Sequence, residues 1–251
     1  MNVGDDLYLG NFEGTQGLCL TTTGQANPTM QIGVGPMGRI AFYNAIPLTI
    51  QTANVAVLQA QTANVPLVLA AGTGATLGTA PDGSGLPVIK FDVPRGVSLT
   101  SGSNLSAGKV LVTGYDQYGQ KMTQLMTNAS TNTVTSLKAF ASILSAVPDT
   151  TSASTMSIGS SDLFGLPFYI ADVGYIISVK WNETLASDAG TFVAGVATVP
   201  STNLLGDVRG TYVPSANASN GTRRLVIAMH LTGAQCGSAP TIVGLLGQPQ
   251  V

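Results

Sequence analysis

Apolar and polar residues alternate along several short stretches of the chain, and this period of two predicts β-strands. The longest stretch is 168–181, in which seven apolar or aromatic residues share one parity. Residues 109–115 and 120–126 flank the letters DQYG at 116–119, and this arrangement predicts a β-hairpin. Further strands are expected at 39–43, 48–58, 65–71, 88–93, 98–99, 191–199, 208–213 and 223–231.

Three stretches depart from this alternation. Residues 137–147 place apolar side chains at helical spacing, so one short helix is expected there. Residues 72–85 are mostly small and glycine-rich, which predicts a long exposed loop or a domain boundary. The Ser/Thr-rich run 151–161 is polar, and neither a helix nor a strand is predicted for it.

The composition agrees with a β-rich chain. Glutamate occurs twice and lysine five times, whereas Thr, Val, Ser and Gly dominate, which favours strands and turns over exposed helices. We therefore expect an all-β protein, an antiparallel β-sandwich or jelly roll with at most one short helix. Residues 1–80 would form an N-terminal arm and β segment and residues 81–251 the sandwich domain, unless both belong to one domain.

Charge is scarce in this sequence. Asp, Glu, Lys and Arg make up 9% of the residues, against about 25% in an ordinary soluble domain. Charge keeps soluble proteins apart and is depleted in the centres of protein–protein interfaces, so an obligate assembly fits better than a free monomer. A weakly charged β monomer remains the alternative. The ten basic residues are scattered, so no basic stripe for nucleic acid is expected.

Membrane insertion and export are not expected either. The first residues are acidic rather than basic, and no apolar run reaches about twenty residues, the length of a spanning helix. Cys19 and Cys236 stand near opposite ends of the chain, and we expect two reduced thiols, although a bridge between them is conceivable.

Residues with catalytic chemistry are nearly absent. The single histidine, His230, lies in an apolar run on the same strand face as Val226 and Ala228, which is typical of a half-buried strand residue. The letters GVGPMG at 33–38 match a dinucleotide-binding pattern, but Pro36 lies inside it, a strand-like run rather than a helix follows it, and no acidic residue appears until Asp82. We therefore expect no enzyme, and no catalytic, cofactor or metal site.

Two small groups of residues remain as candidates for contact with partners. One is a cluster of charges near the end of the chain, expected either as an internal ion pair or at a subunit interface. It comprises Asp207, Arg209, Arg223 and Arg224. The other is the expected hairpin tip, which would be exposed and, in a glycan-binding or receptor-binding protein, would offer aromatic rings beside a carboxylate. It comprises Tyr115, Asp116 and Tyr118.

Three stretches resemble parts of structural proteins of tailed-bacteriophage virions. They are LSAGKVLVTGYDQYGQKMTQ at 105–124, SDLFGLPF at 161–168 and GDVRGTYVPSANASNGTRRLVI at 206–227. The group they are similar to is the small head proteins of the capsid cement, or decoration, type.

This resemblance implies a structural role without catalytic residues. It implies a β-sandwich module on the capsid exterior, forming trimers or dimers and bound to the major capsid protein, made in the host cytoplasm. A tail or adaptor component, or a receptor- or glycan-binding β module, is the alternative within the same group.

Overall fold

The computed structural model describes residues 40–102, 108–127, 133–182, 184–185, 189–231 and 246–251. Cys19, Cys236 and the glycine-rich letters at 33–38 lie outside these residues, so the expectations about them stay predictions.

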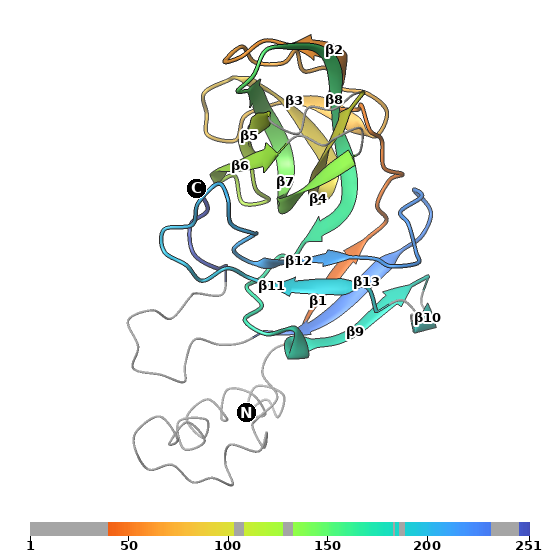
Figure 1. Cartoon of the computed structure of the whole chain (residues 1–251). Helices are drawn as coiled ribbons and strands as arrows, with labels where there is room; N and C mark the ends of the chain where they lie inside the picture. Colours follow the sequence, from red (N-terminus) through yellow and green to blue (C-terminus); the bar gives the residue numbers. More distant parts are fainter. Residues whose placement is uncertain (1–39, 103–107, 128–132, 183, 186–188, 232–245) are drawn as a thin grey trace, which may run out of the picture.

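Two antiparallel sheets form the structure, and the larger one curls into a half-barrel (Figure 1). In the larger sheet the order is β11-β12-β8-β4-β7-β5-β6, with β2 beside β8 and β3 beside β4. In the smaller sheet the order is β1-β13-β9-β10. The larger sheet contains β2 (Ala56–Gln61), β3 (Ala75–Thr79), β4 (Pro87–Ser101), β5 (Lys109–Tyr115), β6 (Lys121–Thr127), β7 (Thr133–Pro148), β8 (Ser152–Gly165), β11 (Thr191–Ala194) and β12 (Gly210–Val213). The smaller sheet contains β1 (Ile40–Ala45), β9 (Ile176–Trp181), β10 (Thr184–Leu185) and β13 (Leu225–His230).

The expected fold class is confirmed. Every strand pairing is antiparallel, and the two sheets make a sandwich-like arrangement. Within the described residues the single helical element is a 3-10 turn at Val173–Tyr175. The three described strands before residue 80 pair with strands after residue 81, so the expected division between 1–80 and 81–251 coincides with no break in the described strand pairing.

The helix expected at 137–147 is wrong, because these residues belong to the sixteen-residue strand β7. This strand lies between β4 and β5, and neighbours in its sequence such as Ala139 and Phe140 are both buried. A strand covered on both faces needs no alternation of apolar and polar residues, so its pattern imitates that of a helix.

Other boundaries also differ from expectation. The predicted strand 168–181 shortens to β9, because Asp172 accepts a hydrogen bond from the Gly174 N–H at 2.6 Å and starts the 3-10 turn. Residues 152–161 of the polar run belong to β8, and Ser157, Ser160 and Ser161 are buried there. The predicted loop 72–85 contains β3, and 65–71 forms no strand.

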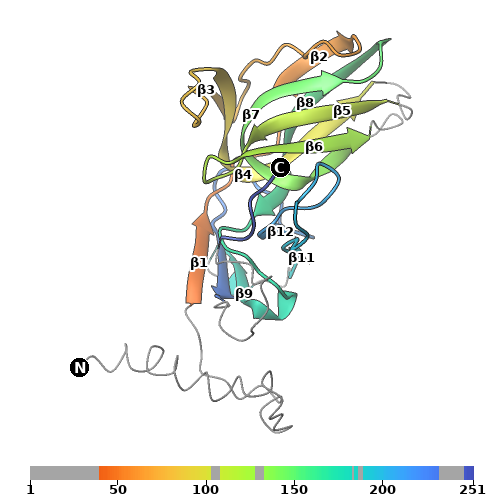
Figure 2. The same ribbon diagram turned by 90° about the vertical axis from the view of Figure 1, so that its left-hand side faces the viewer.

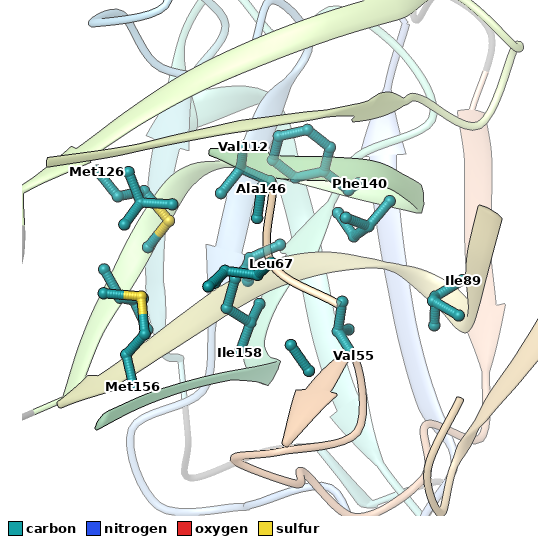
Figure 3. Packing of buried hydrophobic residues seen from close by; sticks show 14 of the residues in the cluster. Val55, Leu67, Ile89, Val112, Met126, Phe140, Ala146, Met156 and Ile158 are labelled. Carbon is teal, nitrogen blue, oxygen red and sulfur yellow. The ribbon is translucent and has the colours of Figure 1, made fainter. Parts of the chain in front are cut away.

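A first hydrophobic core fills the concave side of the curled sheet (Figure 3). Two segments outside the strands close it, and their backbone is tied to the sheet. Val55 donates to the Ile158 carbonyl at 3.0 Å, and Leu67 donates to the Ala146 carbonyl at 2.9 Å. The side chains of both residues are buried, so irregular segments 48–55 and 62–71 act as a cover for the core.

A second core joins the two sheets. Phe164 of β8 and Tyr212 of β12 stack with ring centroids 6.4 Å apart, and the Trp181 indole N–H of β9 donates to the Tyr212 hydroxyl at 3.3 Å. Tyr43 and Ile227 of the smaller sheet pack into the same cluster. The views in Figures 1 and 2 show the smaller sheet at the end of the half-barrel where β12 lies.

Gly159 of β8 allows the covering segment to approach the sheet. The Gln51 carbonyl accepts a hydrogen bond from Ser160 N–H at 2.8 Å, and the Ser160 hydroxyl accepts one from Gln51 N–H at 3.1 Å. A Cβ at Gly159 would lie 1.9 Å from the Gln51 carbonyl oxygen, far inside contact distance. A side chain is therefore excluded at this position.

We expect Gly159→Ala to lower the free energy of unfolding by about 1–3 kcal/mol, because the added methyl group forces the covering segment off β8. Gly206→Ala is the matched control, since its Cβ would meet its nearest neighbour at an ordinary 3.5 Å. That change should stay within about 0.5 kcal/mol. Urea unfolding of the three proteins measures both values, and equal midpoints for the two variants would contradict the close approach.

Candidate functional site

The turn between β5 and β6 is held by the carboxylate of Asp116. Its Oδ1 accepts hydrogen bonds from the Tyr118 N–H at 2.8 Å and the Gln120 N–H at 2.9 Å. Gly119 has a φ of 77°, a conformation that glycine adopts without strain. The letters DQYG therefore make the predicted turn, and Oδ2 of Asp116 remains for a further partner.

That partner is Arg209, which comes from the residue just before β12. Its Nη2 donates to Asp116 Oδ2 at 2.9 Å, and the two side chains are 3% and 0% exposed. The guanidinium also lies 5.1 Å from the centre of the Tyr118 ring and donates to the Leu246 carbonyl at 3.5 Å. The structure thus joins one residue of each candidate group, Arg209 and Asp116, in a buried ion pair.

Asp207 lies beside this ion pair, but its carboxylate oxygens accept hydrogen bonds from other groups. Its Oδ1 accepts from the Arg209 N–H at 2.9 Å, and its Oδ2 accepts from the Ala139 N–H at 3.2 Å and from Gln250 Nε2 at 3.4 Å. Burial raises the pKa of Asp207, and the Arg209 charge opposes that rise. Asp207 therefore links β12, β7 and segment 246–251.

Lys138 of β7 completes the cluster. Its side chain is buried, and its Nζ donates to the main-chain oxygen of Val251 at 2.6 Å. Burial lowers the pKa of Lys138 from 10.5 to about 8, although the charge of Asp207 favours the protonated form. A lysine held this way is stabilised by a peptide segment rather than by water.

The expectation of an exposed hairpin tip is wrong for two of its three residues. Tyr115 is 1% exposed and Asp116 is 2% exposed, whereas Tyr118 is 45% exposed. The Tyr115 hydroxyl donates to Asp82 Oδ2 at 2.6 Å, and hydrogen bonds from Ser84 and Tyr115 lower the pKa of Asp82 to about 2. Tyr118 donates to the Pro167 carbonyl at 2.6 Å.

Arg223 and Arg224 do not join this cluster. They precede β13 in the smaller sheet, and β13 pairs with β1 and β9 rather than with β12. Arg223 donates to the Ala218 carbonyl at 3.3 Å, and the side chain of Arg224 is exposed. The interface role suggested for these two arginines stays a prediction.

A second arginine is also used inside the molecule. Arg95 is 1% exposed, its Nε lies 3.3 Å from Asp92 Oδ1, and both of its terminal nitrogens donate to the Leu48 carbonyl at 3.1 Å. Its guanidinium lies 5.6 Å from the centre of the Phe164 ring. Several of the few charged side chains in this sequence therefore make contacts inside the molecule.

The exposed part of the site is a hollow of about 220 Å³. It is lined by Tyr118, Gln120, Arg209, Leu246, Gly247 and Pro249. Among the described residues no group of three His, Cys, Asp or Glu side chains could hold a metal ion. His230 is a half-buried residue of β13, as expected, and its ring stacks on Tyr175 at 5.7 Å.

Sequence reasoning missed Lys138, Gln248 and Gln250. Lys138 is a single charge in the run LKAFASIL, and this isolation is a signal that could have marked a buried, partnered lysine. The two glutamines carry no comparable signal, because their role depends on where segment 246–251 docks. Segment 246–251 and the ion pair together connect β7, the β5–β6 turn and the residues just before β12.

No family model, no curated protein and no solved structure matches this chain. In the part of the chain that the structure describes, no helix is long and apolar enough to cross a membrane.

Arg209→Ala should lower the free energy of unfolding by about 3–5 kcal/mol, because it leaves the buried Asp116 carboxylate without its counter-charge. Arg224→Ala provides a control arginine whose side chain is exposed, and it should change stability by less than about 0.5 kcal/mol. Denaturant unfolding compares them. A small effect at Arg209 would show that water replaces the guanidinium.

The lowered pKa of Lys138 predicts a dependence of stability on pH. Below pH 8 the lysine is charged in both states, and folding bears the full cost of burying the charge. Between pH 8 and 10.5 the unfolded chain keeps a proton that the folded chain has lost, so stability rises with pH.

We expect the stability of the wild type relative to Lys138→Met to increase across this window by at most about 3 kcal/mol. Chemical unfolding of both proteins at a series of pH values measures the difference. A constant difference from pH 7 to 11 would contradict a buried, titrating lysine.

Proposed function

We propose that the chain is a non-enzymatic structural subunit that acts as a cement, or decoration, protein on the capsid of a tailed bacteriophage. One observation carries the assembly role: residues 40–81 contain no Asp, Glu, Lys or Arg, yet they supply β1, β2 and β3. Among the residues that the structure describes, each of these strands pairs with a single neighbour, so the three uncharged strands lie at sheet edges.

These edges also present large apolar side chains to solvent. Phe42 of β1 is 67% exposed, Leu58 of β2 is 60% exposed and Leu77 of β3 is 70% exposed. Proteins that remain monomeric usually protect edge strands with charge, proline or a covering element. Uncharged apolar edges are instead suited to being covered by another protein subunit.

The cement role in particular is supported by the resemblance of 105–124, 161–168 and 206–227 to phage head proteins. Low charge allows such a module to pack against a shell without the cost of removing water from ions. Many weak contacts, repeated over the capsid lattice, then give strong overall binding. The partners would be the major capsid protein and further copies of the chain, as trimers or dimers on the virion exterior.

The glycan- or receptor-binding alternative depended on exposed aromatic rings beside a carboxylate at the hairpin tip. The burial of Tyr115 and Asp116 removes two of those three groups from the surface. A tail or adaptor position remains the competing outcome of the experiment below.

Phage particles purified from infected cells that produce the tagged chain should carry this chain at regular positions on the capsid exterior. Cryo-electron microscopy of the particles shows these positions. Leu77→Lys should reduce occupancy roughly tenfold or more, because an unpaired ammonium group would be buried at the contact. Thr76→Lys, exposed on the opposite face of the same strand, tests whether added charge alone has this effect. Absence from particles, or a position on the tail, would refute the cement role.

A further inference from the structure

Residues 246–251, LGQPQV, dock against the larger sheet as an irregular segment with alternating burial. Gln248 and Gln250 are 8% and 5% exposed, whereas Leu246 and Val251 are 46% and 53% exposed. Pro249 between the glutamines restricts the backbone and reduces the entropy lost on docking. The two glutamine side chains therefore enter the protein while the residues around them stay outside.

The receiving surface is polar and is assembled from parts distant in sequence. Gln248 Nε2 donates to the carbonyls of Val196, at 3.1 Å, and Thr198, and Gln250 Nε2 donates to Asp207 at 3.4 Å. We call this surface the tail groove. It is formed by Lys138, Val196, Thr198, Ser201, Asp207 and Arg209.

The backbone of the segment is recognised by side chains. Ser201 Oγ donates to the Pro249 carbonyl at 3.4 Å and accepts from the Val251 N–H at 3.0 Å, and Lys138 Nζ donates to Val251 O at 2.6 Å. Arg209 donates to the Leu246 carbonyl at 3.5 Å. Every described hydrogen bond of the segment involves a side chain, so it docks as a bound peptide rather than as an added strand.

Much of the groove is held by contacts that do not involve the segment. Asp207 is fixed by the N–H groups of Arg209 and Ala139, and Arg209 is fixed by Asp116. Lys138 belongs to β7, which is paired on both sides by β4 and β5. A site that exists before its ligand arrives binds at a lower cost in ordering.

The connection to the rest of the chain is long. Fourteen residues, 232–245, lie between the end of the described part after β13 and Leu246. Such a length can span at most roughly 50 Å. A domain of this size has a radius of gyration of about 18 Å, so this reach is sufficient to arrive at the groove of an adjacent molecule.

We propose that the tail groove is a peptide-docking site and that, in the assembled protein, it is occupied by segment 246–251 of a second copy of this chain. The exchanged contacts are the same as those within one copy, so the exchange costs little beyond association. It deepens the proposed structural function by naming the segment that joins copies.

The first experiment uses a variant that stops after residue 245 and a fluorescent peptide of the sequence LGQPQV. The truncated chain should bind the peptide, measured by fluorescence anisotropy. Lys138→Met with Ser201→Val in the truncated chain removes three hydrogen bonds and should weaken binding about 100-fold. A peptide with both glutamines changed to alanine is the matched control and should not bind.

The second experiment tests exchange between copies. The truncated chain has a groove and no segment, and full-length Lys138→Met/Ser201→Val has a segment and a damaged groove. Each alone should lack the exchanged contact, whereas their mixture should form a mixed complex whose mass is seen by light scattering. Circular dichroism and thermal melting confirm that both variants are folded.

Peptide binding without a mixed complex would overturn the exchange and leave a contact within one copy. A folded truncated chain that does not bind the peptide would overturn the docking site itself. Both measurements use purified chains without particles, so the capsid role can fail while the exchange stands, and the reverse also holds.

Discussion

The buried ion pair between Arg209 and Asp116 is the contact on which the hairpin β5–β6, the strand β12 and segment 246–251 converge. Asp116 also closes the β5–β6 turn with its other oxygen, so the carboxylate satisfies local and distant donors at once. Tyr118 covers the guanidinium and shields the pair from water. A pair of this kind fixes geometry, because either charge alone would be costly to bury.

Scarce charge explains much of how the molecule is built. Arg95, Arg209 and Lys138 are buried and bonded to carboxylates or carbonyls within the chain, which leaves fewer charges for the surface. The uncharged residues 40–81 then form sheet edges with exposed apolar side chains. The internal use of charged residues and the uncharged strands at the sheet edges together leave edges that are apolar.

The two sheets are coupled through one shared aromatic core rather than through a linker. Phe164 and Tyr212 belong to the larger sheet, Trp181 belongs to the smaller one, and all three lie in the same buried cluster. Separate unfolding of either sheet would expose these rings. Segment 246–251 contacts the larger sheet at β7, where Lys138 donates to the Val251 oxygen.

The sequence alone determined the all-β class, the hairpin at DQYG, the half-buried strand position of His230 and the rough places of most strands. These follow from short-range rules: alternation, turn chemistry and the shortage of helix-forming surface residues. Only the tertiary structure decided that residues 137–147 form a strand, because burial on both faces of β7 removes the alternation that marks strands.

The candidate site, like the fold, could be predicted from the sequence only in part. The sequence singled out Asp116, Tyr118, Asp207 and Arg209 as two separate groups, since nothing local links a hairpin turn to a strand ninety residues later. Which strands become neighbours decides that these two groups meet and that Tyr115 is buried. It also decides that Lys138 finds a partner and that Gln248 and Gln250 dock. Strand order is set by the packing of the whole chain, so it cannot be read from the pattern of any one segment.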